Sequence, residues 1–310
     1  MVHTPYDGSH KPFTIGLSQL DHAEWIEVDD NLADYLKEKH RLYREETHNV
    51  LVAEQGTEAA QQEVLEMLVE HLPKHFPEIY KCQNNVVTIA PSFHLPAFAG
   101  MTMRGGWDDD VRASAIATAA LLIQEDLVLM RKSPEGWRLV AASLCFPSAW
   151  NLREKFGKAL HAIHAPVPNF GPGTRNAGLI DRMFDNLRPD HSVMRWNWSL
   201  YGDAELYHPA SDHGMKKRFG DGNLAGHVTL RLERQTLRKL PKSGDILFTI
   251  RIYIDPLEVL ARLPNGKALA EAIEDQIMAM TDAEINYKGF ADERQQLSRR
   301  LREIAQQAVV

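Results

Sequence analysis

Residues 227–257 constrain the fold more than any other part of this chain, because they hold two runs with the two-residue alternation of β-strands. In the first run, apolar residues at positions 228, 230 and 232 alternate with polar residues at positions 229, 231, 233 and 235. In the second run, the even positions 246–254 carry isoleucine or phenylalanine, and Thr249, Arg251 and Tyr253 point the other way. The connector contains Pro241 and a Ser-Gly pair, which is typical of a turn. The pattern predicts two strands of an antiparallel sheet.

Arg234 breaks the alternation of the first strand. By period two it falls on the apolar side, where an arginine needs an anionic partner or a route to water. A sheet floor that ends in arginine can hold an anionic ligand, such as a cofactor that carries carboxylates.

The rest of the chain supplies three more strands and several helices. Further strands are expected at 127–131, 137–146 and 193–201, with a hairpin turn at 133–136. Helices are expected at 32–43, 58–72, 150–161, 178–187 and in several segments after Leu257, with Thr57 capping the second and Pro73 ending it. Residues 281–284 have the pattern of a capping box.

This order of elements predicts a mixed α+β fold. Two strands, then helices with irregular backbone, then three strands is the order of a PAS domain, an antiparallel five-stranded sheet with covering helices. We therefore expect an N-terminal helical and irregular extension (1–122), a PAS-like core (123–257) and a C-terminal helical extension (258–310), together forming one compact unit.

Charge and cysteine content narrow the possible functions. The net charge of −7 argues against nucleic acid as a partner, and no run approaches the roughly 18 apolar residues that a membrane span needs. Two cysteines cannot form a disulfide framework or hold a four-cysteine iron–sulfur cluster, and the N-terminus lacks the apolar region of a secretion signal. We expect a cytoplasmic protein. The sequence also lacks the glycine-rich motifs of nucleotide sites, so redox chemistry would need electrons from a separate protein.

Several separate motifs, in order, resemble the heme-dependent oxidative N-demethylase-like family. The resemblance covers nearly the whole chain, and is carried by residues 231–241 (RLERQTLRKLP), 243–244 (SG), 247–251 (LFTIR), 124–127 (QEDL), 145–150 (CFPSAW) and 163–168 (IHAPVP), with Pro12-Phe13, Gly16-Leu17 and Trp25 nearer the N-terminus. It implies that heme b is held in a PAS-like core and that a small secondary amine, such as dimethylamine, is oxidised at its N-methyl carbon. Formaldehyde and a primary amine would be released, with flavin and iron–sulfur reductase subunits as partners.

Two other readings remain open. PAS domains are commonly sensory modules, so the chain could bind heme or another small ligand without turnover. It could also be a relative that has lost heme and binds an unrelated metabolite.

A heme protein needs a metal ligand, and His164 is the leading candidate. It follows the expected helix 150–161 and precedes Pro166, so it can face the sheet from the end of a helix. His161 is the nearest rival, one helical turn earlier, and His191 and His227 come next. The alternative for each is a histidine that caps a helix or packs in the core.

The strands supply the remaining candidates. Arg231, Arg234 and Arg251 could bind the heme propionates, because a guanidinium pairs bidentately with a carboxylate. Glu233 is a candidate base for the cationic amine, with a surface ion pair as the alternative. Tyr253, as a second catalytic candidate, and Trp198, beside the cofactor, could line the pocket, although aromatic residues in strands more often pack.

Overall fold

The alternating runs of the sequence pair into one large antiparallel sheet in the computed structural model, which describes residues 2–9, 11–83, 86–90, 114–209, 218–219 and 228–308. The strands are β1 (Ser18–Leu20), β2 (Leu51–Ala53), β3 (Tyr80–Gln83), β4 (Val86–Ile89), β5 (Asp126–Ser133), β6 (Gly136–Ser143), β7 (Ser192–Tyr201), β8 (Thr229–Lys239) and β9 (Ile246–Pro256). The α-helices are α1 (Leu32–Glu45), α2 (Thr47–Val50), α3 (Glu58–His75), α5 (Ala115–Ala120), α6 (Leu152–Lys155), α7 (Leu160–Ile163), α8 (Arg175–Asn186), α9 (Gly266–Ala279), α10 (Asp282–Lys288) and α11 (Arg294–Gln307). Two 3-10 helices, η1 (His22–Glu24) and η3 (Leu257–Arg262), complete the set.

The mixed α+β fold is confirmed, but the sheet is larger than expected. It has seven strands in the order β1-β7-β8-β9-β5-β6-β2, with β3 and β4 forming a separate hairpin. The five expected strands are adjacent, and the short strands β1 and β2 extend the sheet at its two edges. The sequence did not reveal these two because three residues are too few to show alternation.

Strand register divides the central side chains between the two faces of the sheet. Glu233 pairs with Asn197 on β7 and with Ile252 on β9, and residues paired in this way point to the same side. Arg234 pairs with Trp196 and Arg251 and therefore points to the other side. We call these two sides the Glu233 face and the Arg234 face.

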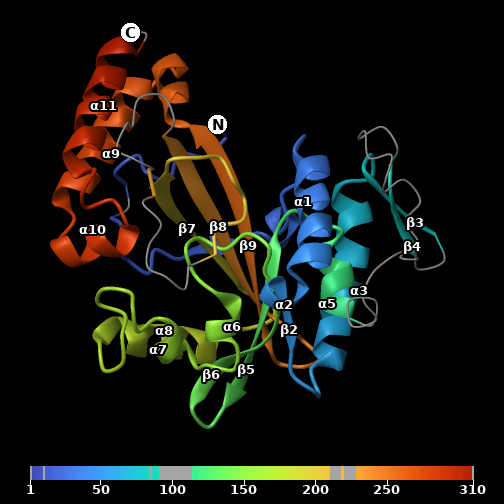
Figure 1. The fold of residues 1–310 in the computed structure, drawn as a ribbon. Helices are drawn as coiled ribbons and strands as arrows, with labels where there is room; N and C mark the ends of the chain where they lie inside the picture. The colour runs from blue at the N-terminus through green and yellow to red at the C-terminus, as the bar shows by residue number, and fades with distance from the viewer. Residues whose placement is uncertain are drawn as a thin grey trace.

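Helices cover both ends of the sheet (Figure 1). Leu200, Leu230 and Leu232, on the Arg234 face, belong to the same buried cluster as the apolar residues of α9 and α11. Further along the same face, Leu127 and Leu247 share a cluster with residues of α1, α3 and α5. Residues 1–122 thus contribute both edge strands and packing helices. None of the described helices is long and apolar enough to cross a membrane.

Two expected helices differ in the structure. The helix expected at 150–161 is two short helices, α6 and α7, because Gly157 adopts a positive φ of 75° and its N–H bonds to the carbonyl oxygen of Leu139 on β6 at 2.9 Å. The helix that starts at Glu58 continues past Pro73 to His75. A proline in the last turn removes a single hydrogen bond, so the helix does not end there.

Of two further expectations about helix ends, the one at Thr57 was wrong and the one at Thr281 is confirmed. The Thr57 side chain makes no capping hydrogen bond, and bonds instead to the carbonyl oxygen of Glu54 at 2.6 Å. The capping box at Thr281 and Glu284 is present and starts α10.

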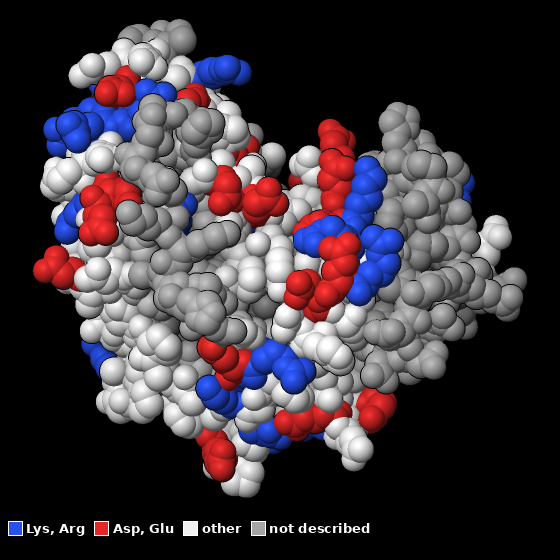
Figure 2. Space-filling model, in the orientation of Figure 1, with Lys and Arg blue, Asp and Glu red and all other residues white. Residues whose placement is uncertain are grey.

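Charged side chains of both signs lie side by side over α1 (Figure 2), where Arg41 bonds to Glu38 and Glu45 at 2.6 Å.

Candidate active site

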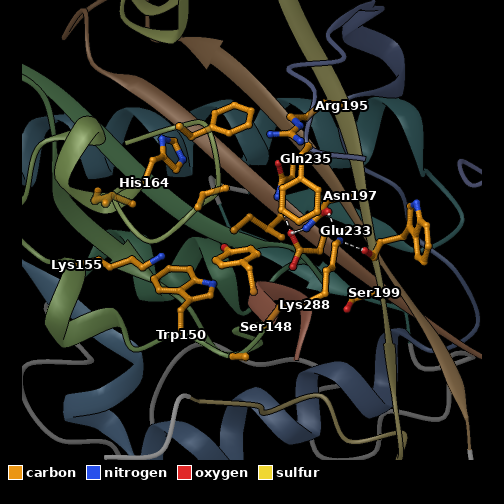
Figure 3. Close-up of a pocket in the computed structure, with 18 of the residues that line it drawn as sticks. Ser148, Trp150, Lys155, His164, Arg195, Asn197, Ser199, Glu233, Gln235 and Lys288 are labelled. Carbon is orange, nitrogen blue, oxygen red and sulfur yellow. Dashed lines mark hydrogen bonds between the residues drawn. The ribbon is translucent and has the colours of Figure 1, made fainter. Parts of the chain in front are cut away.

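A cavity of about 260 Å³ lies on the Glu233 face of the sheet. Its floor is formed by β7, β8 and β9, one wall by the segment from α6 to α8, and another by the end of α10. The wall near α7 is apolar, with Ile163, Val167 and Phe170, whereas the floor carries Asn197 and Glu233. The cavity thus has an apolar side and a polar side (Figure 3).

His164 lies on the apolar wall and points into the cavity (Figure 3). It is the first residue after α7, and its N–H donates to the carbonyl oxygen of Leu160 at 2.9 Å. Burial, together with the positive charges of Lys155 and Arg195, lowers the pKa of His164 to about 4. The imidazole is therefore neutral at pH 7, which is the form that binds a metal ion.

The two rival histidines that the structure describes do not line the cavity. His161 belongs to the same short helix but does not line the cavity. His191 is exposed and lies 3.2 Å from a carboxylate oxygen of Asp190. His227 falls outside the described residues.

Glu233 is buried in the cavity floor and is held by two neutral amides. Its Oε2 accepts a hydrogen bond from Gln235 Nε2 at 2.6 Å and another from Asn197 Nδ2 at 3.3 Å. Among the described residues, no cationic side chain forms an ion pair with Glu233. The second carboxylate oxygen is left for a ligand.

Lys288 approaches the same floor from the end of α10. Its side chain is buried, and Nζ donates to Asn197 Oδ1 at 3.1 Å and to the carbonyl oxygen of Trp198. Burial lowers the pKa of Lys288 to about 7, against an opposing effect of the Glu233 charge.

Two further cations line the cavity with unused donors. Arg195 donates from Nη2 to the carbonyl oxygen of Thr14 at 3.2 Å, but its buried Nε has no acceptor in the part of the chain that the structure describes. Lys155 stacks over the ring of Trp150 at 4.4 Å, and burial lowers its pKa to about 8. Neither side chain pairs with a carboxylate of the described residues, so the cavity has unsatisfied positive charge.

Arg231 also lines the cavity, and each of its three guanidinium nitrogens donates to an acceptor within the chain. Nε donates to Ser148 Oγ at 3.0 Å, and the two terminal nitrogens donate to four backbone carbonyl oxygens, those of Phe146, Pro147, Glu205 and Leu206, at 3.0–3.3 Å. These bonds tie β8 to the segments after β6 and β7. Arg231 thus shapes the cavity, and its Nη1, which makes one hydrogen bond among the described residues, keeps a second N–H.

Arg234 and Arg251 lie on the opposite side of the sheet from His164. Arg234 Nε lies 2.9 Å from Glu27 Oε1, and Nη1 donates to the carbonyl oxygen of Trp25 at 3.0 Å. Arg251 donates to Asp29 Oδ2 at 2.8 Å, and the Tyr253 hydroxyl donates to Glu27. Arg234 therefore has its anionic partner within this chain, and the structure does not bring Arg234, Arg251 or Tyr253 to the cavity.

The motif at 124–126 anchors the same N-terminal segment. Glu125 Oε1 accepts from the N–H of Glu27 at 3.0 Å, and Gln124 Nε2 donates to Asp29 Oδ1 at 2.8 Å. Asp126 accepts from the N–H groups of residues 145 and 146 at 2.8 Å, so it fixes the chain where it leaves β6.

Trp198 contacts both the cavity and the buried cluster of the C-terminal helices. It lines the cavity, yet its ring meets that of Tyr6 edge-on at 6.4 Å within the cluster of the C-terminal helices. The backbone carbonyl of Trp198 is the group that accepts from Lys288.

The sequence did not reveal several cavity residues, among them Lys155, Arg195, Asn197 and Lys288. Two of them could have been found from the sequence. Arg195 and Asn197 alternate with tryptophans in the strand at 193–201, which places both side chains on the same face of that strand. Lys288 and Lys155 carry no such signal, since each comes from a helix end that only the tertiary fold brings to the sheet.

A comparison with protein families finds one match that spans most of the chain. The family described as "Haem-dependent oxidative N-demethylase, alpha subunit-like" matches residues 16–298.

Proposed function

Because this chain belongs to the family of heme-dependent oxidative N-demethylase alpha subunit-like proteins, we propose that it oxidises the N-methyl group of a small secondary amine such as dimethylamine. The family name indicates an oxidoreductase that depends on heme, and an alpha subunit implies further subunits. The proposed products are formaldehyde and the primary amine.

The single observation that carries the proposal is the neutral His164 imidazole on the apolar wall of a cavity whose floor carries the carboxylate of Glu233. An apolar slot with one neutral histidine fits a heme, and the unsatisfied Nε of Arg195 and the ammonium of Lys155 fit its two propionates. We therefore assign His164 as the iron ligand, and Arg195 and Lys155 as the propionate partners. Heme b is the proposed form because Cys82 and Cys145 are too far apart in the sequence to form the Cys-x-x-Cys-His motif of covalent heme attachment.

The central strands support the proposed PAS-like core. Their order, β6-β5-β9-β8-β7, joins an N-terminal hairpin to three later strands through helical segments that cover the Glu233 face. A heme between those segments and the sheet would lie in the cavity that His164 lines.

Glu233 is the proposed amine site. A small secondary amine is a cation in water, so a carboxylate with a free oxygen can bind its N–H and accept the proton. When bound, heme supplies the oxidation of the N-methyl carbon. Glu233 would hold the amine nitrogen on the polar side of the cavity, so that the methyl group points toward the apolar side.

The proposed partners are subunits that carry flavin and an iron–sulfur cluster. The chain has two cysteines, and of these Cys145 is buried and Cys82 is exposed, so it cannot bind a four-cysteine cluster by itself. We also propose a cytoplasmic location, where both cysteines would stay reduced.

The test is an absorption spectrum of the heme-reconstituted protein, titrated with dimethylamine. We expect a Soret band that shifts saturably with the amine in the wild type, and loss of heme binding in His164→Ala but not in the control His161→Ala. If His164→Ala binds heme with an unchanged spectrum, this ligand assignment is wrong. A Soret band that ignores amines would favour the sensor alternative, and no band would remove heme from the proposal.

A further inference from the structure

We propose that Lys288, acting through Asn197, is a positioning residue that turns Glu233 so that one of its two carboxylate oxygens faces the amine. The inference rests on the proposed amine site at Glu233 and adds α10 to that site. It gives the C-terminal helical segment a role in substrate binding.

The three side chains form a continuous line of hydrogen bonds from α10 to β8 (Figure 3). Lys288 Nζ donates to Asn197 Oδ1 at 3.1 Å, and Asn197 Nδ2 donates to Glu233 Oε2 at 3.3 Å. Asn197 and Glu233 are directly paired across β7 and β8, so their backbones fix the spacing between the two side chains.

The chemistry of the donors sets the direction of this line. The amide of Asn197 can present either its oxygen or its NH₂ group to each neighbour. A charged lysine only donates, so the amide must turn its oxygen to Lys288 and its NH₂ group to Glu233. Without Lys288, the amide can rotate and present its oxygen to the carboxylate, which would repel it.

The carboxylate then has only one oxygen available. Gln235 Nε2 donates to the same Oε2 at 2.6 Å, so that oxygen accepts two hydrogen bonds. No hydrogen bond to Oε1 is present among the described residues. A ligand with an N–H group therefore meets a carboxylate whose orientation is already set, which reduces the ordering that binding must impose.

Lys288 is itself held in place by its surroundings. Its Nζ also donates to the carbonyl oxygen of Trp198, and it lies 5.4 Å from the ring centroids of both Phe13 and Trp198. Burial lowers the pKa of Lys288 to about 7, but a neutral amine still has two N–H groups for its two acceptors. The line of hydrogen bonds can therefore persist in either charge state.

The experiment compares variants with the wild type by titrating heme-loaded protein with dimethylamine and following the Soret band. Lys288→Met removes the donor at similar length, and we expect the Kd of the amine to rise about tenfold, as for the loss of one well-placed hydrogen bond. Lys288→Gln keeps an N–H donor without the charge, and should recover part of that loss. Lys267→Met is the control, because Lys267 is exposed on α9 and lies 3.9 Å from Glu271.

A double variant tests whether Lys288 acts through Asn197. If it does, adding Lys288→Met to Asn197→Leu should weaken amine binding no further than Asn197→Leu alone. Additive losses would overturn the relay, as would a Lys288→Met protein that binds dimethylamine like the wild type.

A crystal structure of Lys288→Met gives a readout that needs neither heme nor activity. We expect the Asn197 Nδ2 to Glu233 Oε2 contact of 3.3 Å to be lost, and an unchanged contact would overturn the inference. Wild-type protein that fails to load heme, or loads it without responding to amines, would refute the proposed function. The crystal structure would still decide whether Lys288 positions Glu233.

Discussion

Replacing Arg231 with methionine separates a structural role from a cofactor role for this buried arginine. Its guanidinium makes five hydrogen bonds, four of them to backbone carbonyl oxygens. The bonds to Phe146 and Pro147 are fully buried, whereas the acceptors at residues 205 and 206 are only partly buried and can bond to water instead.

The magnitude follows from the two buried acceptors. Each would lose its partner at a cost of about 1–3 kcal/mol, and removal of a desolvated charge offsets part of that loss. We therefore expect Arg231→Met to lower the free energy of unfolding by about 3 kcal/mol. Arg188→Met is the matched control, because Arg188 pairs with Asp190 at the surface and should change stability by less than about 1 kcal/mol.

The assay is urea unfolding followed by circular dichroism, with linear extrapolation to zero denaturant. An Arg231→Met protein within about 0.5 kcal/mol of the wild type would refute the structural account. If that protein also bound heme more weakly, Arg231 would instead be a cofactor residue, as first expected from the sequence.

Three further predictions concern acid stability, amine binding and the start of α9. Burial lowers the pKa of His71 to about 4, below its unfolded value of about 6.5, so its contribution to stability is complete above pH 6.5 and is lost as the pH falls toward 4. His71→Leu should reduce that acid-induced loss in the free energy of unfolding by at most about 3 kcal/mol, measured as the difference between the wild type and the variant at each pH. Glu233→Gln keeps the shape of the side chain but removes its charge, and should raise the Kd of dimethylamine at least about tenfold in a Soret titration without preventing heme binding. Gly266→Ala should lower the melting temperature, because a β-carbon there would lie 1.7 Å from a backbone oxygen, whereas Gly178→Ala, whose β-carbon has no neighbour closer than 4.0 Å, should stabilise α8 by up to about 1 kcal/mol.

Local pattern was enough to predict the central strands and their two faces. The alternation around Arg231 and Glu233 correctly put both side chains on one face, because side chains in a strand have a period of two whatever lies above the sheet. The capping box at Thr281 was equally readable, since its two hydrogen bonds join residues only three apart. The expectation that Arg234 needs an anionic partner or a route to water also followed from the sequence.

The identity of that partner depended on the tertiary structure. Glu27 lies more than 200 positions before Arg234, and nothing local indicates that residues 24–29 would cross the Arg234 face. For the same reason, the sequence could not show which face of the sheet would hold a cavity. Long-range packing made that choice, by placing α9 and α11 on one face and the α6–α8 segment on the other.

Part of the candidate site could also be predicted from the sequence, and part depended on the tertiary structure. The alternation of β8 and the position of His164 at the end of a helix were visible in the sequence, although Gly157 breaks that helix into two. The hydrogen bonds from Lys288 to Asn197 and from Asn197 to Glu233 were not visible, because they join three elements separated by long stretches of chain. Periodicity determines which way a strand residue points, but only the packing of distant elements decides what it meets there.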